Sequence, residues 1–452
     1  MQTYSFAPLS WEWLEELIPF LDPSRKIIIG ESSTRLCEGE PLTHPLFMEI
    51  IKEIRRRFPQ TPLQITTNGT YLKADNIKEM APLNPAGPHL SSRSGEAGLE
   101  FIISLNSLSA ERRARIMGDH SPYEVRSGLA VLKEMGIAFQ GSVVALPHLT
   151  GWDDLEETLF YLEQEGASST RIFLPGYTSY AHPSLHFSSS LWAELDAFIL
   201  KMREKITHPL TLEPPLLRDL SPRVQGVLRF SPAYQAGLRS GDLILSVNGE
   251  EMRSGQEAFH RLQQADHPLV EVERSGETAP ALAQPEAAQA VLEGFWRQEG
   301  KGLARRFTLR LAKKGGERTG LVFNADLDPH LIAAVERIGE RNTNSPVLLL
   351  TSVLGAPLWK AARQRNLIPA NIEISIVANR FFGGSICCAG LLTVDDFETH
   401  LRERIPSFEH PTGQPPVVLA PTAPFDRRGF DLLGVHYREL KGRFPGLSIL
   451  FL

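Results

Sequence analysis

The chain has few cysteines, no long apolar run and no excess of positive charge. Its 452 residues include three cysteines, Cys37, Cys387 and Cys388, which are too few for a disulfide framework and fit a reducing cytoplasm. No apolar run approaches the roughly 20 residues of a membrane-spanning helix, and the start of the chain lacks the basic and apolar parts of a signal peptide. The formal net charge is −6, so no general attraction to nucleic acid is expected. We therefore predict a cytoplasmic protein with no nucleic-acid or membrane partner.

Length and composition indicate several globular domains. Hydrophobic residues make up 42% of the chain and charged residues 22%, as in ordinary soluble proteins. A chain of 452 residues suggests about three domains. Prolines punctuate residues 167–222, which show no clear periodicity and therefore indicate a boundary region. We predict domains at residues 1–215, 222–318 and 319–452.

The first half of the chain repeats a strand–helix pattern. Strand-like runs begin at nearly even intervals, at Lys26, Leu63, Phe101, Phe139 and Arg171. Helical patterns cover residues 10–21, 45–57, 121–135 and 152–165. This alternation predicts a parallel sheet, either open or closed into a barrel. Such sheets carry their functional residues at the carboxyl ends of the strands, which here are residues 38–41, 67–70, 104–107, 147–148 and 175–177.

The segment after the first predicted strand carries a family motif. It reads GEPLTHPLFMEIIKEIRRRFPQTPLQITTNGTYL over residues 39–72, and SLNS at 104–107, RIMGDHSPYEVRSGLAVLKEMGI at 115–137 and SVVALP at 142–147 follow. In order and spacing these pieces resemble the radical SAM superfamily around its Gly-Gly-Glu-Pro motif. The resemblance implies a partial (β/α)6 barrel, a [4Fe-4S] cluster and S-adenosylmethionine. It also implies reductive cleavage of S-adenosylmethionine to a 5′-deoxyadenosyl radical, which abstracts a hydrogen atom from a substrate.

The same resemblance implies which residues hold S-adenosylmethionine. The second Gly, the Glu and the Pro of the motif match Gly39, Glu40 and Pro41, and Glu38 replaces the first Gly. In the family the motif presents backbone carbonyls and a carboxylate, here that of Glu40, to the positively charged amino group of the cofactor. The predicted cofactor-binding residues, at three strand ends, are Glu38, Gly39, Glu40, Pro41, Thr67, Asn68, Ser104 and Asn106.

Each of these signals also has a purely structural interpretation. Without the family, Gly39–Pro41 is an ordinary loop and Asn68-Gly69 is a common turn. In the segment around Asn106, a helix-capping role for Ser107 or Ser109 is as plausible as a cofactor role for Asn106.

The cysteine loop of the family, Cys-x3-Cys-x2-Cys, does not occur in this sequence. In the family it lies between a first strand and the helix predicted here at 10–21, and the residues before Ser10 are too few for both. Cys387 and Cys388 are adjacent, so in a strand they would point to opposite faces and hardly ligate one cluster. We therefore predict no metal ligands in this chain. Either the first strand and the cluster loop lie upstream of Met1, or the protein is a cluster-free relative that keeps the barrel for binding.

Residues 224–262 resemble a PDZ domain of the bacterial type. The signals are Ser-Pro-Ala at 231–233, Ala-Gly-Leu at 236–238, a strand at 243–247, an Asn-Gly hairpin turn and a helix at 255–264. The resemblance implies β-augmentation, in which a peptide joins an exposed strand edge. It implies that a protein C-terminal peptide is held by Gln225, Gly226, Val227 and Leu228, on a strand that continues to Phe230. Alternatively, another domain covers this edge and the module only joins parts of the protein.

The PDZ-like domain closes late in the sequence. Residues 269–274 form a predicted strand whose partner is predicted at 307–311. Residues 277–304 between them show little periodicity. We predict an inserted loop there, with one short helical turn.

The last third of the chain has its own alternation of elements. We predict helices at 331–341, 356–364 and 397–404, and strands at 347–351, 372–377 and 417–420. Three segments, Leu350–Ser352, Asn379–Gly383 and Ala389–Thr393, resemble the DUF512 domain. Glycines give the loop after residue 377 a permissive backbone, which suits either a substrate loop facing the barrel mouth or tight packing.

These observations predict an α/β protein. Its parts are a partial parallel (β/α) barrel that lacks its first strand, a small mostly-β PDZ module and an α+β C-terminal domain. The predicted function is that of a radical SAM oxidoreductase-like protein that takes hydrogen from an unidentified substrate, with a peptide as the candidate. The alternative is a cluster-free, non-enzymatic adaptor that binds peptides on a degenerate barrel. The sequence contains no recognisable P-loop or dinucleotide fingerprint.

Overall fold

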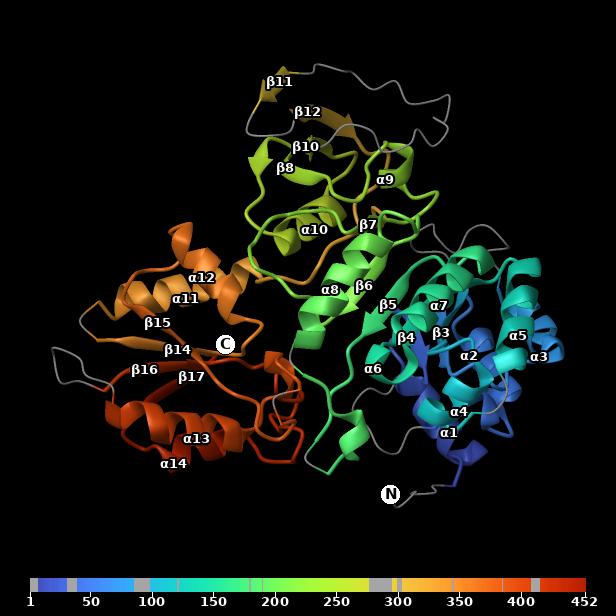
Figure 1. The fold of residues 1–452 in the computed structure, drawn as a ribbon, viewed down its shortest axis with the longest axis horizontal. Coiled ribbons are helices and arrows are strands. Elements are labelled where there is room, and N and C mark those ends of the chain that lie inside the picture. The colour runs from blue at the N-terminus through green and yellow to red at the C-terminus, as the bar shows by residue number, and fades with distance from the viewer. Residues whose placement is uncertain are drawn as a thin grey trace.

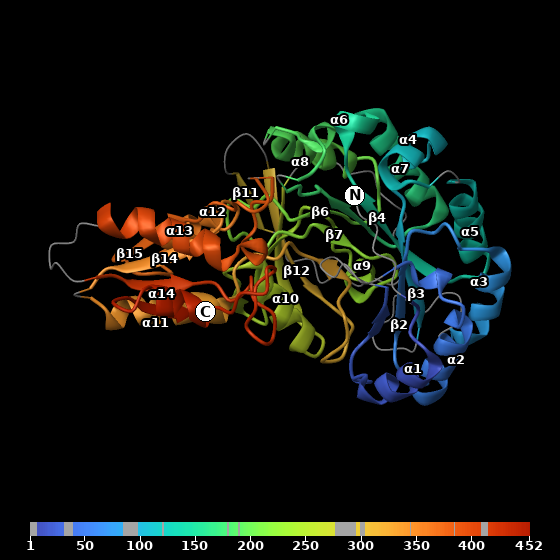
Figure 2. The ribbon, with the colours of Figure 1, turned by 90° about the horizontal axis from the view of Figure 1, so that it is seen from below.

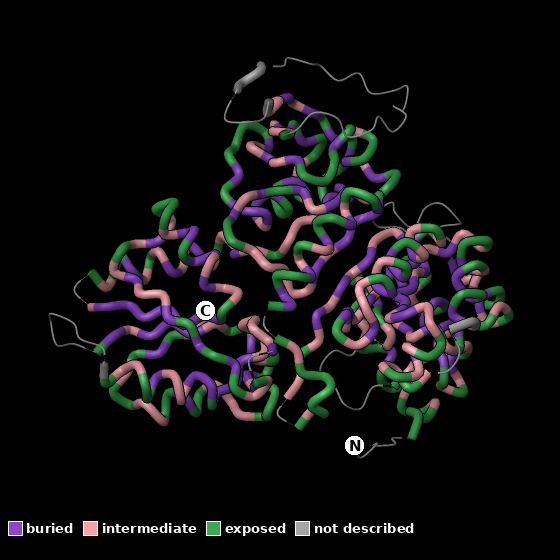
Figure 3. Tube along the Cα trace, in the orientation of Figure 1, coloured by how far each residue is buried: buried purple, intermediate pink, exposed green. Residues whose placement is uncertain are grey.

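The chain folds into three lobes, each with its own buried core. The computed structural model describes residues 7–30, 39–84, 98–119, 122–178, 180–188, 190–275, 295–298, 303–343, 345–383, 385–407 and 415–452. Figure 1 shows the three lobes side by side, and Figure 3 shows that buried residues follow the central strands of each.

The first lobe is built on a curved, six-stranded parallel sheet (Figure 2). Its strands lie in chain order: β1 Ile27–Ile29, β2 Leu63–Thr67, β3 Leu99–Ser104, β4 Ala138–Val144, β5 Thr170–Phe173 and β6 Leu210–Glu213. All neighbouring strands pair in parallel. The sheet has two edges, β1 and β6, which confirms the predicted partial barrel.

Helices line the convex face of this sheet (Figure 2). They are α1 Trp11–Leu17, α2 Phe47–Arg57, α3 Ala74–Met80, α4 Ala110–Met117, α5 Pro122–Glu134, α6 Pro147–Thr150, α7 Trp152–Glu165 and α8 Ser190–Met202. Side chains alternate along a strand. In β3, Leu99, Phe101 and Ile103 are therefore buried in the core with the helices, whereas Glu100 and Ser104 face the concave side.

The sequence does not predict β6 or α8. Both lie within the region that prolines interrupt, and β6 has only four residues, too few to show a period. Its Leu210 and Leu212 are buried in the same core as Leu195 and Ile199 of α8. Packing against the rest of the sheet therefore defines these elements, rather than a local pattern.

The second lobe is an antiparallel sheet with the strand order β11-β12-β10-β8-β9. Its elements are β8 Leu243–Val247, β9 Glu250–Glu251, β10 Leu269–Ser275, β11 Phe295–Gln298, β12 Leu303–Arg310, α9 Pro232–Gln235 and α10 Gly255–Gln264. The backbone of Asn248 and Gly249 has φ angles of 54° and 83°, which confirms the predicted hairpin turn. The prediction of a short helical turn in the insertion is wrong, because Phe295–Gln298 form the strand β11, which pairs with β12. Residues 276–294 and 299–302 lie outside the described residues.

A separate two-stranded pair joins the second lobe to the third. β7 Gly226–Val227 pairs antiparallel with β13 Leu321–Val322. The continuation of β7 to Phe230 predicted from the sequence is wrong, because Arg229 and Phe230 form a turn in which Phe230 has a φ of 63°. One edge of β7 is therefore already paired within the protein.

The third lobe is a four-stranded parallel sheet with helices on both faces. The strands are β14 Val347–Thr351, β15 Ile372–Ile376, β16 Val417–Ala420 and β17 Ser448–Phe451, in the order β15-β14-β16-β17. One core contains α11 Pro329–Arg341 and α12 Ala356–Gln364, and the other contains α13 Val394–Arg404 and α14 Arg438–Arg443. The predicted helices and strands of this region are present, and β17 and α14 extend them. Among the described residues of the whole chain, no helix combines the length and apolar character of a membrane span.

Candidate functional site

The carboxylate of Glu40 joins the ends of the first two strands. Glu40 Oε1 accepts a hydrogen bond of 2.6 Å from the Thr67 hydroxyl, and Oε2 accepts one of 2.8 Å from the Asn68 backbone N–H. Oε1 also accepts the Leu42 N–H at 3.2 Å, so that Glu40 caps the 3-10 turn Pro41–Thr43. The sequence thus correctly places Glu40, Thr67 and Asn68 together at one edge of the sheet.

Gly30 lets Pro41 reach this position. Gly30 follows β1 with a φ of +80°, and a Cβ there would lie 2.6 Å from the Thr66 carbonyl oxygen and 2.7 Å from Pro41 Cγ. No other residue fits such a conformation and spacing without displacement. By contrast, a Cβ on Gly39 would meet no atom of the described residues within 4 Å. Glu38 lies outside the described residues.

A buried arginine supports the same edge from α4. The side chain of Arg113 is fully buried and forms an ion pair with Asp119. Its Nη2 donates to the Asn68 carbonyl at 2.7 Å, and its Nη1 lies 3.5 Å from the Ser104 carbonyl. Asp119 also accepts the Thr70 hydroxyl at 2.9 Å. The arginine therefore fixes the carboxyl ends of β2 and β3 relative to each other, a role that the sequence pattern did not suggest.

Asn106 and Ser104 also lie at this edge of the sheet, at the end of β3 and in the loop that follows it. Asn106 Oδ1 accepts the Val144 N–H at 2.8 Å, which ties the loop after β3 to the end of β4. Ser104, the last residue of β3, faces the concave side of the sheet. Ser109 caps α4 through a hydrogen bond from the Arg112 N–H, while the Ser107 hydroxyl donates to Asp154 at 2.8 Å.

Glu213 adds a carboxyl group at the far end of the same edge. It ends β6 opposite Phe173 of β5, on the concave side because Leu212 faces the core. Burial raises the pKa of Glu213, and Arg171 and Thr211 oppose that rise. In the sequence, only the apolar–polar alternation of Leu-Thr-Leu-Glu at 210–213 could have indicated this strand and its carboxyl group, and four residues are too few to distinguish a strand.

The third lobe docks onto the end of β5. The Tyr177 N–H donates to Ser385 Oγ at 2.8 Å, and a Cβ on Gly176 would overlap the side chain of Ile386. Tyr177 also stacks on His186, with ring centroids 4.4 Å apart, and meets Phe187 edge-on. The loop after β15 therefore packs against the loop after β5, at the carboxyl ends of the barrel strands. Tight packing does not explain the glycines of the loop itself, because a Cβ on Gly383 would meet no described atom within 4 Å and one on Gly390 only the Ala423 carbonyl oxygen at 3.7 Å.

The described residues do not assemble a metal site. Among them, no three His, Cys, Asp or Glu side chains are grouped so as to hold a metal ion. Cys387 and Cys388 are half-buried, lie in a loop rather than in a strand, and are not in a disulfide. Burial raises the pKa of both thiols. Cys37 lies outside the described residues.

The residues predicted to hold a peptide face the barrel. The Gln225 side chain accepts a hydrogen bond of 2.8 Å from Arg203, which directly follows α8, and a Cβ on Gly226 would lie 2.5 Å from Pro209. The Leu228 N–H donates to the Gly320 carbonyl, and Val227 is buried. The structure thus has the arrangement of the second interpretation, in which another domain covers this edge.

Comparison with known families agrees with this architecture. Residues 12–162 match the model of the radical SAM superfamily. We call the first lobe, which contains this match, the radical SAM domain. Residues 223–273 match the model of a PDZ domain, and we call the second lobe, which contains them, the PDZ domain.

Curated relatives that match part of this chain include two GTP 3′,8-cyclases. A GTP 3′,8-cyclase of Paenarthrobacter nicotinovorans is 42% identical over 59 residues, which are 13% of this chain and 16% of that protein. A GTP 3′,8-cyclase of Mycolicibacterium smegmatis is 30% identical over 141 residues, 30% of this chain and 34% of that protein. The chain thus spans between 16% and 34% of the length of these relatives.

Two solved structures are similar to parts of this chain at low sequence identity. Streptococcus suis SuiB bound to the precursor peptide SuiA is 11% identical with a TM-score of 0.34, covering 46% of this chain and 43% of that one. A domain of pyruvate-formate lyase-activating enzyme from Bacteroides vulgatus is 10% identical with a TM-score of 0.29, covering 39% of this chain and 95% of that one.

Proposed function

We propose that the radical SAM domain binds S-adenosylmethionine at the edge formed by Glu40, Asn68 and Asn106, and that the protein is a radical SAM oxidoreductase acting on an unidentified substrate. The supporting observation is the Glu40 carboxylate. A carboxylate has about four acceptor positions, and three of them take the donors of Leu42, Thr67 and Asn68. No described residue donates to the fourth, which can accept the ammonium group of the cofactor, and a carboxylate held on three sides would bind it without reorganisation.

The described residues give no support for the iron–sulfur cluster of the family. When bound, such a cluster supplies the electron that cleaves S-adenosylmethionine to the 5′-deoxyadenosyl radical. The described residues do not fit it, because no three potential ligands meet among them. We therefore assign to these residues only the binding and positioning of S-adenosylmethionine.

The partner that we propose is a peptide, because the second lobe is a PDZ domain and such domains bind extended peptides at a strand edge. The edge at Gln225–Leu228 contacts β13 and the barrel, so a peptide would have to displace one of them. We also propose, from sequence motifs alone, that residues 319–452 form a DUF512-like domain.

Calorimetric titration with S-adenosylmethionine tests the binding site. We expect Glu40→Gln to weaken binding by roughly 10- to 100-fold, the loss of a charge-assisted hydrogen bond. Glu49→Gln is the matched control, since Glu49 is exposed on α2 nearby. Equal affinity of Glu40→Gln and the wild type would remove Glu40 from the site.

A second candidate function is a cluster-free adaptor, which the lack of a ligand group among the described residues favours. Anaerobic reconstitution followed by assays of iron, sulfide and 5′-deoxyadenosine separates the two. Cluster uptake with formation of 5′-deoxyadenosine supports the enzyme. A protein that takes up no cluster but binds C-terminal peptides supports the adaptor.

A further inference from the structure

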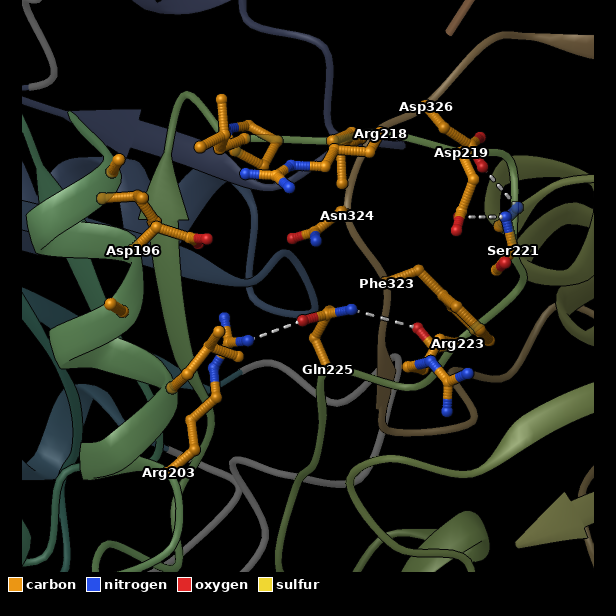
Figure 4. A pocket seen from close by; sticks show the side chains of 18 residues that line it. Asp196, Arg203, Arg218, Asp219, Ser221, Arg223, Gln225, Phe323, Asn324 and Asp326 are labelled. Carbon is orange, nitrogen blue, oxygen red and sulfur yellow. Dashed lines mark hydrogen bonds between the residues drawn. The ribbon is translucent and has the colours of Figure 1, made fainter. Parts of the chain in front are cut away.

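A second pocket lies where the barrel, the PDZ domain and the linker to the third lobe meet (Figure 4). Its walls come from α8, from residues 215–219 after β6, from the start of the PDZ domain and from residues 323–326 after β13. The cavity volume is about 570 Å³, within the range of about 300–1,000 Å³ that is usual for small-molecule sites. The pocket borders β6, one edge strand of the barrel sheet, whereas Glu40 follows β1, the opposite edge strand.

Two polar contacts hold the walls of this pocket in place. Asp326 accepts the backbone N–H groups of Gly255 and Gln256, at 2.6 and 3.0 Å, and so fastens the linker to the start of α10. Arg203 donates to the Leu210 carbonyl and to the Gln225 side chain, and so fastens α8 to the PDZ domain. The pocket is thus framed by contacts between lobes before any ligand binds.

Three other polar side chains in the pocket have no such partner. Among the described residues, none donates a hydrogen bond to the side chain of Asp196 or Asn324 or forms an ion pair with Arg218. Figure 4 shows the amide of Asn324 near the centre of the cavity, with the carboxylate of Asp196 directed toward it and the guanidinium of Arg218 above. Burial raises the pKa of Asp196, and the guanidinium groups of Arg203 and Arg218 oppose this rise. The acid and the arginine are therefore close enough to influence each other.

The rest of the lining combines apolar and polar side chains. Leu200 and Leu212 line the cavity from the barrel, and Phe323 lines it from the linker. A ligand that fits therefore combines a small group carrying both charges with an apolar or extended remainder. The lining contains three aspartates and three arginines in all, and this even balance of charge disfavours a multiply charged anion such as a phosphate.

We propose that this pocket binds a free α-amino acid head group, with the ammonium on Asp196, the carboxylate on Arg218 and the Asn324 amide between them. An α-amino acid carries an ammonium and a carboxylate on the same carbon atom, and Asp196 and Arg218 offer a partner for each in one cavity. Arginine suits the carboxylate because its guanidinium can donate two parallel hydrogen bonds. The side chain of the ligand packs on Leu200 and Phe323. A ligand in this position touches the barrel, the PDZ domain and the linker to the third lobe at once, so its binding tightens their association.

The test uses the full-length protein and a panel of free methionine, leucine and phenylalanine, together with their N-acetyl and carboxamide forms. Binding is measured by saturation-transfer NMR and then by calorimetry. We expect at least one free amino acid to bind, and both of its blocked forms to bind about tenfold or more weakly. Asp196→Asn should abolish the discrimination against the N-acetyl form, and Arg218→Ala the discrimination against the carboxamide. Glu194→Gln is the matched control, because Glu194 is exposed on the same helix outside the pocket.

The proposal is overturned if no free amino acid binds at millimolar concentration, if blocked and free forms bind equally, or if Asp196→Asn and Arg218→Ala behave as the wild type. S-adenosylmethionine carries the same head group, so it serves as a separate arm. If the wild type binds two molecules of S-adenosylmethionine per chain, and Glu40→Gln and Asp196→Asn each bind one, both proposals are supported. If Glu40→Gln abolishes binding and Asp196→Asn has no effect, S-adenosylmethionine binds only in the barrel, and this pocket is refuted as a site for it.

Discussion

Tyr177 and Ser385 are 208 residues apart in the chain and exchange hydrogen bonds. The Tyr177 N–H donates to Ser385 Oγ at 2.8 Å, and the Ser385 hydroxyl lies 3.0 Å from the Tyr177 carbonyl oxygen. Tyr177 belongs to the loop after β5, at the functional edge of the radical SAM domain, and Ser385 to the loop after β15. The third lobe therefore contacts the barrel at the edge where such sheets carry out their function.

Ser385→Ala should loosen this contact. The Tyr177 N–H loses its acceptor, at an expected cost of about 1–3 kcal/mol in the free energy of unfolding. Hydrogen exchange of the Tyr177 amide measures the local effect and should accelerate. Ser127→Ala, on the exposed side of α5, is the control and should leave that exchange unchanged. Unaltered protection of Tyr177 in Ser385→Ala would show that the contact does not hold the loop.

Gly176→Ala tests the same contact through its shape. The new methyl group would overlap the side chain of Ile386, and overpacking of this kind typically costs about 1–3 kcal/mol. Ile386→Ala removes the overlapping atoms. In a double-mutant cycle, Gly176→Ala should therefore cost less in the Ile386→Ala background than in the wild type. Additive effects would mean that the two residues do not meet.

Arg113→Met should destabilise the strand edge that carries Glu40 and Asn68. It removes the fully buried member of the ion pair with Asp119, whose side chain is 12% exposed, and it frees the Asn68 carbonyl. Removing one member of a buried ion pair costs about 3–5 kcal/mol, and we take this as the upper bound here. Urea unfolding measures the loss. Arg115→Met on the same helix, whose hydrogen bond to Leu149 is exposed, should cost far less. Similar losses in the two variants would contradict the role of Arg113 in joining β2 and β3.

Glu163 should make stability depend on pH in the acid range. Burial raises its pKa, but hydrogen bonds from His208 and Thr207 outweigh burial and bring the pKa from 4.5 to about 2. A carboxyl group whose folded pKa is lowered stabilises the protein above the unfolded pKa and loses this contribution as the pH falls toward the folded value. The stability advantage of the wild type over Glu163→Gln should therefore shrink between pH 4.5 and about 2. Unfolding free energies of the two proteins against pH provide the measurement, and a constant difference would contradict the lowered pKa.

Glu163 also lies at a boundary between lobes, since Arg229 of the PDZ domain pairs with it at 3.2 Å. The same titration should therefore weaken the contact between the barrel and the PDZ domain. Arg229→Ala separates the two effects, because it removes the contact between lobes and leaves the hydrogen bonds of Glu163 to His208 and Thr207 in place. We expect Arg229→Ala to keep the acid dependence of the wild type.

Local patterns in the sequence determined the parallel sheet of the radical SAM domain and the grouping of Glu40 with Thr67 and Asn68. Regular strand–helix spacing brings successive strand ends to one edge, whatever the rest of the chain does. The hairpin at Asn248-Gly249 could also be predicted from the sequence, because the turn depends on two adjacent residues.

The tertiary structure alone decided how the lobes meet. Arg113 is one of several arginines in its helix, and nothing in its spacing shows that its side chain is buried beneath two strand ends. Ser385 meets Tyr177 across 208 residues of chain, and Gln225 of the second lobe meets Arg203 of the first. These contacts depend on the complementary shapes of surfaces that exist only after each lobe has folded, so no periodicity in the chain encodes them. The peptide edge of the PDZ domain and the pocket beside Asp196 are consequences of that docking.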